Sequence, residues 1–335
     1  MAGLEFVTTD PPNAGVPMRR FDGRPFGQGD VFQRNNFELP EGGPTSFEVV
    51  VAGRSTRTVM VSDLRGMEQV QVGMMLECAG HARTGMDPVP EGTPWGMGAA
   101  SPLVVRGVPL TAVLDELPDD VVEVVFTGID HGEVPEDGEV HYQFSLSREE
   151  ATQPGPLLVL EMNGTPLRIE RGGPVRLVVP GQYAMKSVKW LTRIEAVTEP
   201  FEGHFVRKYR YYDDTRFDGV EPVGPMLVRA VVASPRAGEA VSAGRFVAKG
   251  MAWTGTGEVE SVDVSPDGGG TWTPASLERR EGSVVWTADV DIPPGATEVV
   301  ARATDSAGNV QPLEAPWNRN GYGNNAVHRV PITAT

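Results

Sequence analysis

The single cysteine of the chain, Cys78, carries its most reactive side chain. One thiol can form neither an internal disulfide nor a cysteine-rich zinc or iron–sulfur site. An apolar run over residues 70–76 ends at the cysteine, the small pair Ala79-Gly80 follows, and Arg83 comes five residues later. This order predicts a strand that delivers a thiol to a loop where backbone approaches a ligand, with a guanidinium that favours the thiolate. The alternative is that Cys78 is a small buried hydrophobic residue.

Further short motifs occur around this loop in a fixed order. They are Phe-Gln-Arg-Asn-Asn at 32–36, Cys-Ala-Gly-His-Ala-Arg at 78–83, Trp-Gly-Met-Gly-Ala at 95–99, Glu-Met-Asn-Gly-Thr-Pro-Leu at 161–167, Gly-Pro-Val-Arg-Leu-Val-Val-Pro-Gly at 173–181 and Ser-Val-Lys-Trp-Leu at 187–191. Together they resemble the sulfite oxidase family of molybdopterin oxidoreductases, in its haem-free bacterial type. The resemblance implies a molybdopterin cofactor whose metal is held by two dithiolene sulfurs and one protein thiolate. Cys78 is the sole candidate for that thiolate.

The resemblance also implies roles for other residues. Arg34 and Arg83 fall on arginines that bind an anionic substrate, and Trp95 falls on the tryptophan that walls the pocket. Tyr209 is preferred to its neighbours Tyr211 and Tyr212 as the tyrosine near the metal. The residues expected at the cofactor are Asn35, Asn36, His81, Arg171, Arg176, Lys186, Ser187 and Lys189. Of these, Arg176, Lys186 and Lys189 are the expected partners of the pterin phosphate, which needs cations.

The chain departs from the family pattern at several positions. Asn36 stands where a histidine is frequent, and Arg171 stands where many members have a cofactor-contacting histidine. A third pocket arginine, expected beside the tryptophan turn at Trp253, is replaced by Glu258. The missing arginine weakens the case for sulfite itself and leaves the case for molybdenum untouched.

The leading hypothesis is a molybdenum-dependent oxidoreductase that oxidises sulfite to sulfate. A second hypothesis keeps the cofactor and has the enzyme reduce a sulfoxide or similar oxo-donor; the pair Arg34 and Arg83 favours an anion. A third hypothesis is a noncatalytic relative of the fold that acts as an interaction protein. The chain has no Cys-x-x-Cys-His motif, so we expect no haem and an external electron acceptor, such as a cytochrome c.

Composition limits the partners and the compartment. The 335 residues carry a formal net charge of −16, which argues against nucleic acid as a partner. No apolar run approaches the roughly 20 residues that span a bilayer, so we expect no membrane association. The N-terminus lacks a basic region followed by an apolar stretch. We therefore expect a cytoplasmic protein as the sequence is written, or a periplasmic one if a signal peptide was removed.

Two domains are expected from the length and the pattern. Residues 1–224 read as an α+β, mixed α/β molybdopterin-binding catalytic domain, in which 1–45 form an extended arm rich in Pro and Gly. Residues 225–335 read as an all-β, immunoglobulin-like sandwich, which the resemblance identifies as a dimerisation domain and so implies a homodimer. Strands are expected at 46–51, 70–76, 121–126, 157–160, 176–179, 191–197, 258–264, 284–292 and 297–304. Helices are expected over 110–117 and after a capping box at Ser147, and the Asp-Gly-Gly stretch at 267–269 is expected to form a hairpin turn.

Overall fold

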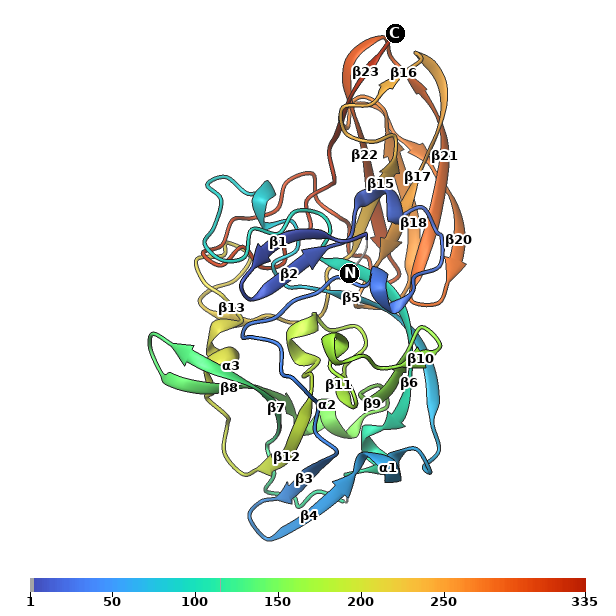
Figure 1. The fold of residues 1–335 in the computed structure, drawn as a ribbon. Coiled ribbons are helices and arrows are strands. Elements are labelled where there is room, and N and C mark those ends of the chain that lie inside the picture. The colour runs from blue at the N-terminus through green and yellow to red at the C-terminus, as the bar shows by residue number, and fades with distance from the viewer. Residues whose placement is uncertain (1–2, 115) are drawn as a thin grey trace.

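The computed structural model describes residues 3–114 and 116–335, and these are mostly β-structure (Figure 1). The α-helices among them are short: α1 (Val61–Leu64), α2 (Arg148–Thr152) and α3 (His204–Lys208). Single 3-10 turns lie at Met18–Arg20, Gln28–Asp30, Arg83–Gly85, Leu110–Ala112, Ile169–Arg171 and Ala184–Lys186. The helical content is therefore smaller than an α+β description suggests. No helix among the described residues is long and apolar enough to cross a membrane.

One five-stranded sheet forms an outer layer of the N-terminal part. Its strands follow the order β4 (Ser55–Met60), β3 (Ser46–Val51), β12 (Leu191–Val197), β7 (Glu123–Val134) and β8 (Gly138–Ser147). Strand β12 pairs in parallel with β3 and antiparallel with β7, so residues about 145 positions apart lie side by side. The bounds predicted for β3 and β12 are confirmed. Both strands are rich in β-branched residues that fit a pleated surface.

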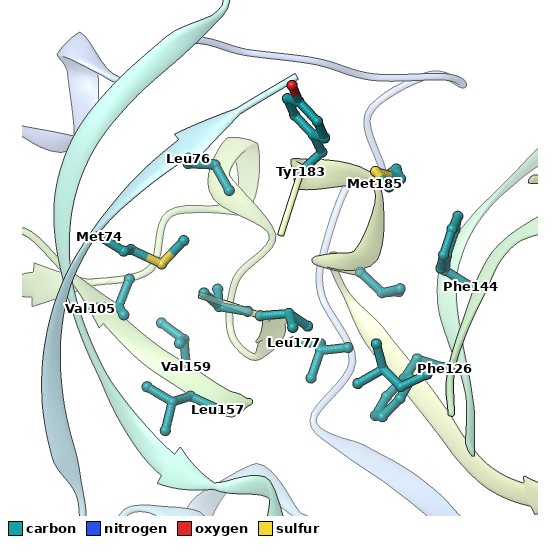
Figure 2. Close-up of a cluster of buried hydrophobic side chains, with 14 of the residues drawn as sticks. Met74, Leu76, Val105, Phe126, Phe144, Leu157, Val159, Leu177, Tyr183 and Met185 are labelled. Carbon is teal, nitrogen blue, oxygen red and sulfur yellow. The ribbon is translucent and has the colours of Figure 1, made fainter. Parts of the chain in front are cut away.

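A second sheet carries the cysteine. Its strands follow the order β10 (Thr165–Pro166), β9 (Leu157–Met162), β6 (Ala100–Pro109) and β5 (Val70–Glu77), and β11 (Arg176–Val178) also pairs with β9. Between the sheets lies an apolar core in which Met74, Leu76 and Val159 of the second sheet face Phe126 and Phe144 of the first (Figure 2). This core fixes the end of β5, where the cysteine follows.

The C-terminal part is a sandwich of two sheets. One has the order β15 (Arg229–Ser234), β17 (Gly244–Trp253), β21 (Ser283–Ile292) and β20 (Ser276–Arg280). The other has the order β16 (Ala240–Val241), β23 (Val330–Ala334), β22 (Gly295–Asp305), β18 (Val259–Ser265) and β19 (Thr273–Pro274). Buried and exposed residues alternate along β21 from Trp286 to Ile292, as expected for a strand with one face on a core. The two packed sheets agree with the predicted sandwich, and its immunoglobulin-like character stays a prediction.

Two local predictions had opposite outcomes. The capping box is confirmed: the Ser147 hydroxyl accepts from the Glu150 N–H at 3.1 Å, and α2 begins there. The helix predicted over 110–117 is wrong for the residues that the structure describes, since only Leu110–Ala112 form a 3-10 turn and residue 115 lies outside them. Leu110, Val113 and Leu114 are buried, so irregular backbone satisfies the apolar spacing that suggested a helix. The stretch at 267–269 does lie in the turn between β18 and β19.

The N-terminal and C-terminal segments both reach the cysteine region. The hairpin β1 (Glu5–Thr9) and β2 (Pro12–Gly15) lies against the body, where the Ala14 N–H donates to the Gln33 carbonyl at 3.0 Å. Two short strands, β13 (Arg210–Tyr211) and β14 (Glu221–Pro222), lie before the sandwich. After β22 the chain returns to the N-terminal part, and the Gly323 N–H donates to the Ala79 carbonyl at 2.9 Å. The cysteine loop is thus enclosed by segments from both ends of the chain.

Candidate active site

The Cys78 loop extends the β5–β6 pairing by one residue. The Cys78 N–H donates to the Ala99 carbonyl at 2.9 Å, and the His81 N–H donates to the Cys78 carbonyl at 2.9 Å to close a tight turn. Gly80 is required by the arginine that folds over this turn, because a Cβ at Gly80 would lie 2.6 Å from Arg83 Nη2. This packing explains the spacing of the Cys-Ala-Gly-x-x-Arg motif, because the guanidinium of Arg83 lies on the glycine next to the cysteine loop's thiol.

Cys78 is 7% exposed and lies where two cavities meet. We name the one that contains Arg171, Arg176 and Lys189 the inner cavity. Its polar and charged lining is Gln33, Arg34, Asn36, Cys78, Asp130, Tyr142, Glu170, Arg171, Arg176, Lys189 and Tyr209. We name the other the vestibule. Its lining is Arg34, Cys78, Arg83, Glu91, Gly92, Thr93, Trp95, Glu136, Lys208, Tyr209, Asn320 and Tyr322.

The inner cavity has more cationic than anionic side chains: Arg34, Arg171, Arg176 and Lys189 line it together with Asp130 and Glu170. Arg171 and Arg176 are about 5% exposed, and their hydrogen bonds go to backbone carbonyls: Arg171 Nε to Gln28 at 2.9 Å, and Arg176 Nη2 to Ser187 at 2.8 Å. Burial lowers the pKa of each arginine to about 10. Burial also lowers the pKa of Lys189 well below its usual value, against the attraction of Asp130. An anionic group in this cavity would compensate these charges.

The same cavity contains polar atoms that lack partners. Gln33 is 1% exposed, and neither its amide oxygen nor its amide nitrogen has a hydrogen-bond partner among the described residues. The Oδ1 atom of Asp130 is likewise unpaired within that part of the chain. A buried polar group without a partner costs about 1–3 kcal/mol. These atoms therefore indicate that the inner cavity receives a polar ligand.

The vestibule presents fixed cations beside the thiol. Arg83 is held by backbone carbonyls, with Nε donating to Asn320 at 2.9 Å and Nη1 to Thr93 at 2.6 Å, and it lies 5.4 Å from the centre of the Tyr322 ring. Arg34 Nη2 donates to the Asn36 side-chain oxygen at 2.7 Å. Since these partners are neutral, both guanidinium charges stay available to an anion.

Trp95 and Tyr209 complete the wall of the vestibule. Trp95 is 1% exposed, and its Nε1–H has no acceptor in the described part of the chain. Its loop is fixed to the cysteine loop because the Ala82 N–H donates to the Gly96 carbonyl at 3.0 Å. Burial raises the pKa of Tyr209, against the opposing charge of Arg34, so its phenol is neutral at neutral pH and can donate a hydrogen bond. The vestibule thus has two hydrogen-bond donors beside its cations.

Burial raises the pKa of the Cys78 thiol, while the charge of Arg34, the Gly80 N–H and the charge of Arg83 lower it. Arg83 thus lowers the pKa of the thiol, as predicted, and Arg34 lowers it more. Without a partner the thiol is therefore protonated at neutral pH, and metal binding would displace its proton. Among the described residues there is no cluster of three or more His, Cys, Asp or Glu side chains that could hold a metal ion.

Comparison with known proteins identifies the family. The family model of the oxidoreductase molybdopterin binding domain matches residues 36–205, and that of the Mo-co oxidoreductase dimerisation domain matches residues 222–335. The chain belongs to the sulfite oxidase family of molybdopterin oxidoreductases. This family membership agrees with the motifs and with a cationic inner cavity that ends at one thiol.

Relatives match over most of the chain. It is 33% identical over 329 residues to the mitochondrial sulfite oxidase of Homo sapiens, covering 90% of this chain and 60% of that protein. It is 32% identical over 324 residues to the sulfite oxidase of Arabidopsis thaliana, covering 85% and 82%. The chain therefore spans about 60% of the length of the mitochondrial relatives. The fold is similar to that of the sulfane dehydrogenase SoxCD of Paracoccus pantotrophus, with a TM-score of 0.82, 24% identity, and coverage of 97% of this chain and 85% of that one.

The residues that line the two cavities fit a bound molybdopterin. The predicted residues that line the inner cavity or the vestibule are Arg34, Asn36, Cys78, Arg83, Trp95, Arg171, Arg176, Lys189 and Tyr209. Tyr209 lines both cavities, whereas Tyr211 stacks on Phe217 and the Tyr212 hydroxyl donates to the Arg207 carbonyl. The inner cavity supplies cations for a phosphate, and the unpaired Gln33 and Asp130 atoms supply partners for a polar ring.

Four residues predicted at the cofactor lie outside both cavities. The Asn35 amide donates to the Pro12 carbonyl and its oxygen accepts from Lys189, so Asn35 positions that lysine. Lys186 pairs with Glu150 of α2. The Ser187 hydroxyl accepts from the Val179 N–H at 3.2 Å. The His81 ring points to the buried Glu77, with 2.7 Å between His81 Nδ1 and Glu77 Oε1. Protein groups thus bind the side chains of Asn35 and Ser187, the ammonium of Lys186 and the Nδ1 atom of His81. The other ring nitrogen of His81, Nε2, is buried and has no partner among the described residues.

Sequence reasoning missed Lys208, the last residue of α3, which lines the vestibule. Its ammonium has no carboxylate partner among the described residues and lies 5.7 Å from the Phe205 ring centre. Partial burial, then the charge of Arg34, lower its pKa. Glu258, which stands where the resemblance leads us to expect a third arginine, is exposed and pairs with Arg279 at 3.2 Å, away from both cavities. Lys208 therefore gives the vestibule a third cation from a different element.

Proposed function

We propose that this protein is a molybdenum-dependent oxidoreductase that oxidises sulfite to sulfate and passes the electrons to an external acceptor. The observation that carries the proposal is the position of Cys78: its thiol ends a cationic inner cavity and opens into a vestibule with Arg34 and Arg83. In balance, sulfite and water give sulfate, two protons and two electrons. Bound molybdopterin would supply the two-electron and oxygen-transfer chemistry.

Residues of the chain would bind the metal, the pterin and the substrate. Cys78 would be the single protein ligand of the metal, since a soft thiolate suits a sulfur-rich site. Arg171, Arg176 and Lys189 would hold the anionic end of the pterin, and Gln33 would bind its polar ring. In the vestibule, Arg34 and Arg83 would bind the oxygens of the substrate, because planar guanidinium groups match oxyanions. Trp95 Nε1–H and the Tyr209 hydroxyl would add neutral donors that fix its orientation.

A second candidate is the reduction of a sulfoxide or a related oxo-donor by the same cofactor. The replacement of the third arginine by Glu258 favours it, since a neutral substrate needs fewer cations. Three cations, Arg34, Arg83 and Lys208, still line the vestibule, and they favour an anion. Sulfite therefore remains the better supported substrate.

The partners follow from the family and the charge. We propose that the protein is a homodimer, because residues 222–335 match a dimerisation domain. Sedimentation at micromolar concentration should give twice the mass of the 36.0 kDa chain, and a monomer would contradict this. We also propose that a basic redox protein, such as a cytochrome c, takes the electrons, since the chain has a net charge of −16. Its reduction rate should fall as the salt concentration rises.

The function is tested by sulfite-dependent reduction of ferricyanide, with molybdenum measured on the same batch of protein. Saturable turnover in proportion to molybdenum content would support the proposal. Full molybdenum occupancy without sulfite turnover would refute sulfite oxidation, and methyl sulfoxide reduction with a reduced dye would then test the second candidate. The Cys78→Ser variant serves as the matched control, because it removes the thiolate and preserves the size of the side chain.

A further inference from the structure

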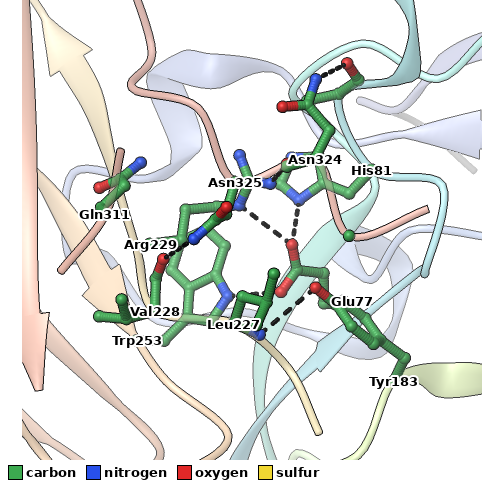
Figure 3. Close-up of polar contacts among 12 residues, drawn as sticks. Glu77, His81, Tyr183, Leu227, Val228, Arg229, Trp253, Gln311, Asn324 and Asn325 are labelled. Carbon is green, nitrogen blue, oxygen red and sulfur yellow. Dashed lines mark hydrogen bonds and ion pairs between the residues drawn. The ribbon is translucent and has the colours of Figure 1, made fainter. Parts of the chain in front are cut away.

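A buried carboxylate lies directly behind the proposed metal ligand. Glu77 is the last residue of β5, and it precedes Cys78 in the chain. Side chains of neighbouring residues in a strand point to opposite sides, so Glu77 points away from the cavities that Cys78 lines. It points instead to the sandwich domain and is fully buried (Figure 3). A charge in this position requires partners on that side.

The partners come mainly from the sandwich domain. One oxygen of Glu77, Oε1, accepts from His81 Nδ1 at 2.7 Å and lies 3.1 Å from Arg229 Nε. The other oxygen, Oε2, accepts from the Trp253 indole N–H at 2.8 Å. Arg229 is 1% exposed and begins β15, and Trp253 ends β17. Two strands of the sandwich thus converge on one carboxylate of the molybdopterin-binding domain (Figure 3).

The same cluster also holds the far end of the cysteine loop. Arg229 Nη2 donates to the Asn324 carbonyl, and the Asn324 side chain donates to the Ala82 carbonyl at 2.8 Å. Trp253 stacks on the His81 ring with centroids 6.1 Å apart and planes 4° apart. The loop is therefore clamped at Glu77 before the cysteine and at Ala82 after it, both times by residues of the sandwich domain.

We infer that Glu77 is a positioning residue through which the sandwich domain fixes the orientation of the Cys78 thiolate. The inference rests on the proposed function, in which Cys78 binds the metal. It goes beyond it by giving the sandwich a direct part in the geometry of the metal site. The carboxylate accepts hydrogen bonds from His81 and Trp253 and forms an ion pair with Arg229, whereas a neutral amide has one acceptor oxygen and no charge. Replacement of Glu77 by glutamine therefore turns one side of the cluster into a donor that faces donors.

The test compares Glu77→Gln with the control Asp305→Asn. Asp305 is also a buried carboxylate; it belongs to the sandwich and accepts from Thr254 at 2.8 Å without touching the cysteine loop. Both variants should lose thermal stability. Only Glu77→Gln should change the Mo(V) electron paramagnetic resonance spectrum and the thiolate-to-metal absorption, with kcat lower by about tenfold, the effect of a small misplacement of a reacting group. The double variant Glu77→Gln/Arg229→Met should be little worse than either single variant, because the two residues act as one unit.

A second measurement does not depend on the metal. Hydrogen exchange of the His81 and Gly323 amides, both bonded to the cysteine loop, should be about tenfold faster in Glu77→Gln than in Asp305→Asn. If the wild type shows a molybdenum–thiolate spectrum and Glu77→Gln shows the same spectrum and the same kcat, the inference is wrong. The proposed function then still stands. A wild-type protein that binds no molybdenum would instead refute the proposed function. Equal hydrogen-exchange rates of these amides in Glu77→Gln and Asp305→Asn would contradict the inference that Glu77 holds the cysteine loop, whatever the metal content.

Discussion

Replacement of Arg83 by methionine tests the substrate role of the vestibule most sharply. Arg83 is 5% exposed, and two of its nitrogens already bind carbonyls, at 2.9 Å and 2.6 Å. Its Nη2 edge lies over Gly80, beside the thiol. Loss of a charge-assisted hydrogen bond to the substrate costs about 1.5–3 kcal/mol. Since 1.4 kcal/mol is a factor of ten, KM for sulfite should rise about 10- to 150-fold.

The assay is steady-state sulfite oxidation with ferricyanide, corrected for the molybdenum content of each variant. Arg83→Lys keeps the charge and loses the planar fork, so its KM should lie between those of the wild type and Arg83→Met. The control is Arg245→Met, in which an exposed arginine paired with Asp289 is removed from the sandwich. An unchanged KM in fully loaded Arg83→Met would refute the assignment of Arg83 to the substrate.

Further predictions concern the neighbours of Arg83 and the inner cavity. Gly80→Ala should raise KM for sulfite in the manner of Arg83→Met with little loss of stability, because the added Cβ would lie 2.6 Å from Nη2 and displace the guanidinium; a normal KM would contradict this. Lys208→Met should lower kcat/KM by about two- to fivefold and flatten its salt dependence. The control is Lys249→Met, which changes a lysine of β17 in the sandwich that lines neither cavity. Partial burial, then Arg34, lower the pKa of Lys208, so its charge is lost at lower pH than in an ordinary lysine; kcat/KM should fall as pH rises through that step, and Lys208→Met should lack the step. Gln33→Leu should leave the cofactor-free protein as stable as the wild type or more stable, because the Gln33 side-chain amide has no protein partner to lose among the described residues. It should lower molybdenum occupancy, because the amide would no longer bind the cofactor. Normal occupancy by metal analysis would contradict the placing of the cofactor in the inner cavity.

The parts of the site that are local in sequence could be predicted. Cys78, Gly80 and Arg83 belong to one short loop, so their spacing predicts that the guanidinium packs onto the glycine, as it does. The strands β3 and β12 were predicted because their β-branched runs match a half-buried surface. By contrast, β4 was missed because nearly all of its side chains are exposed, which leaves no apolar alternation to read.

The remainder depends on contacts between distant segments. Lys208 reaches the vestibule only because α3 ends beside Tyr209, about 130 residues after the cysteine. Gln33 was part of a recognised motif, yet its importance lies in the partners that it lacks, which no sequence pattern reveals. His81 was assigned to the cofactor because of its place beside Cys78. It faces the other way since Glu77, Arg229 and Trp253 form a buried cluster across the domain boundary.

We propose above that the thiolate of Cys78 is a ligand of molybdenum. X-ray absorption at the molybdenum edge, on wild-type protein and on Cys78→Ser, tests it most directly. We expect three sulfur neighbours in the wild type, two from the pterin and one from the cysteine, and two in the variant. Equal numbers of sulfur neighbours in both proteins, at equal molybdenum occupancy, would contradict the claim.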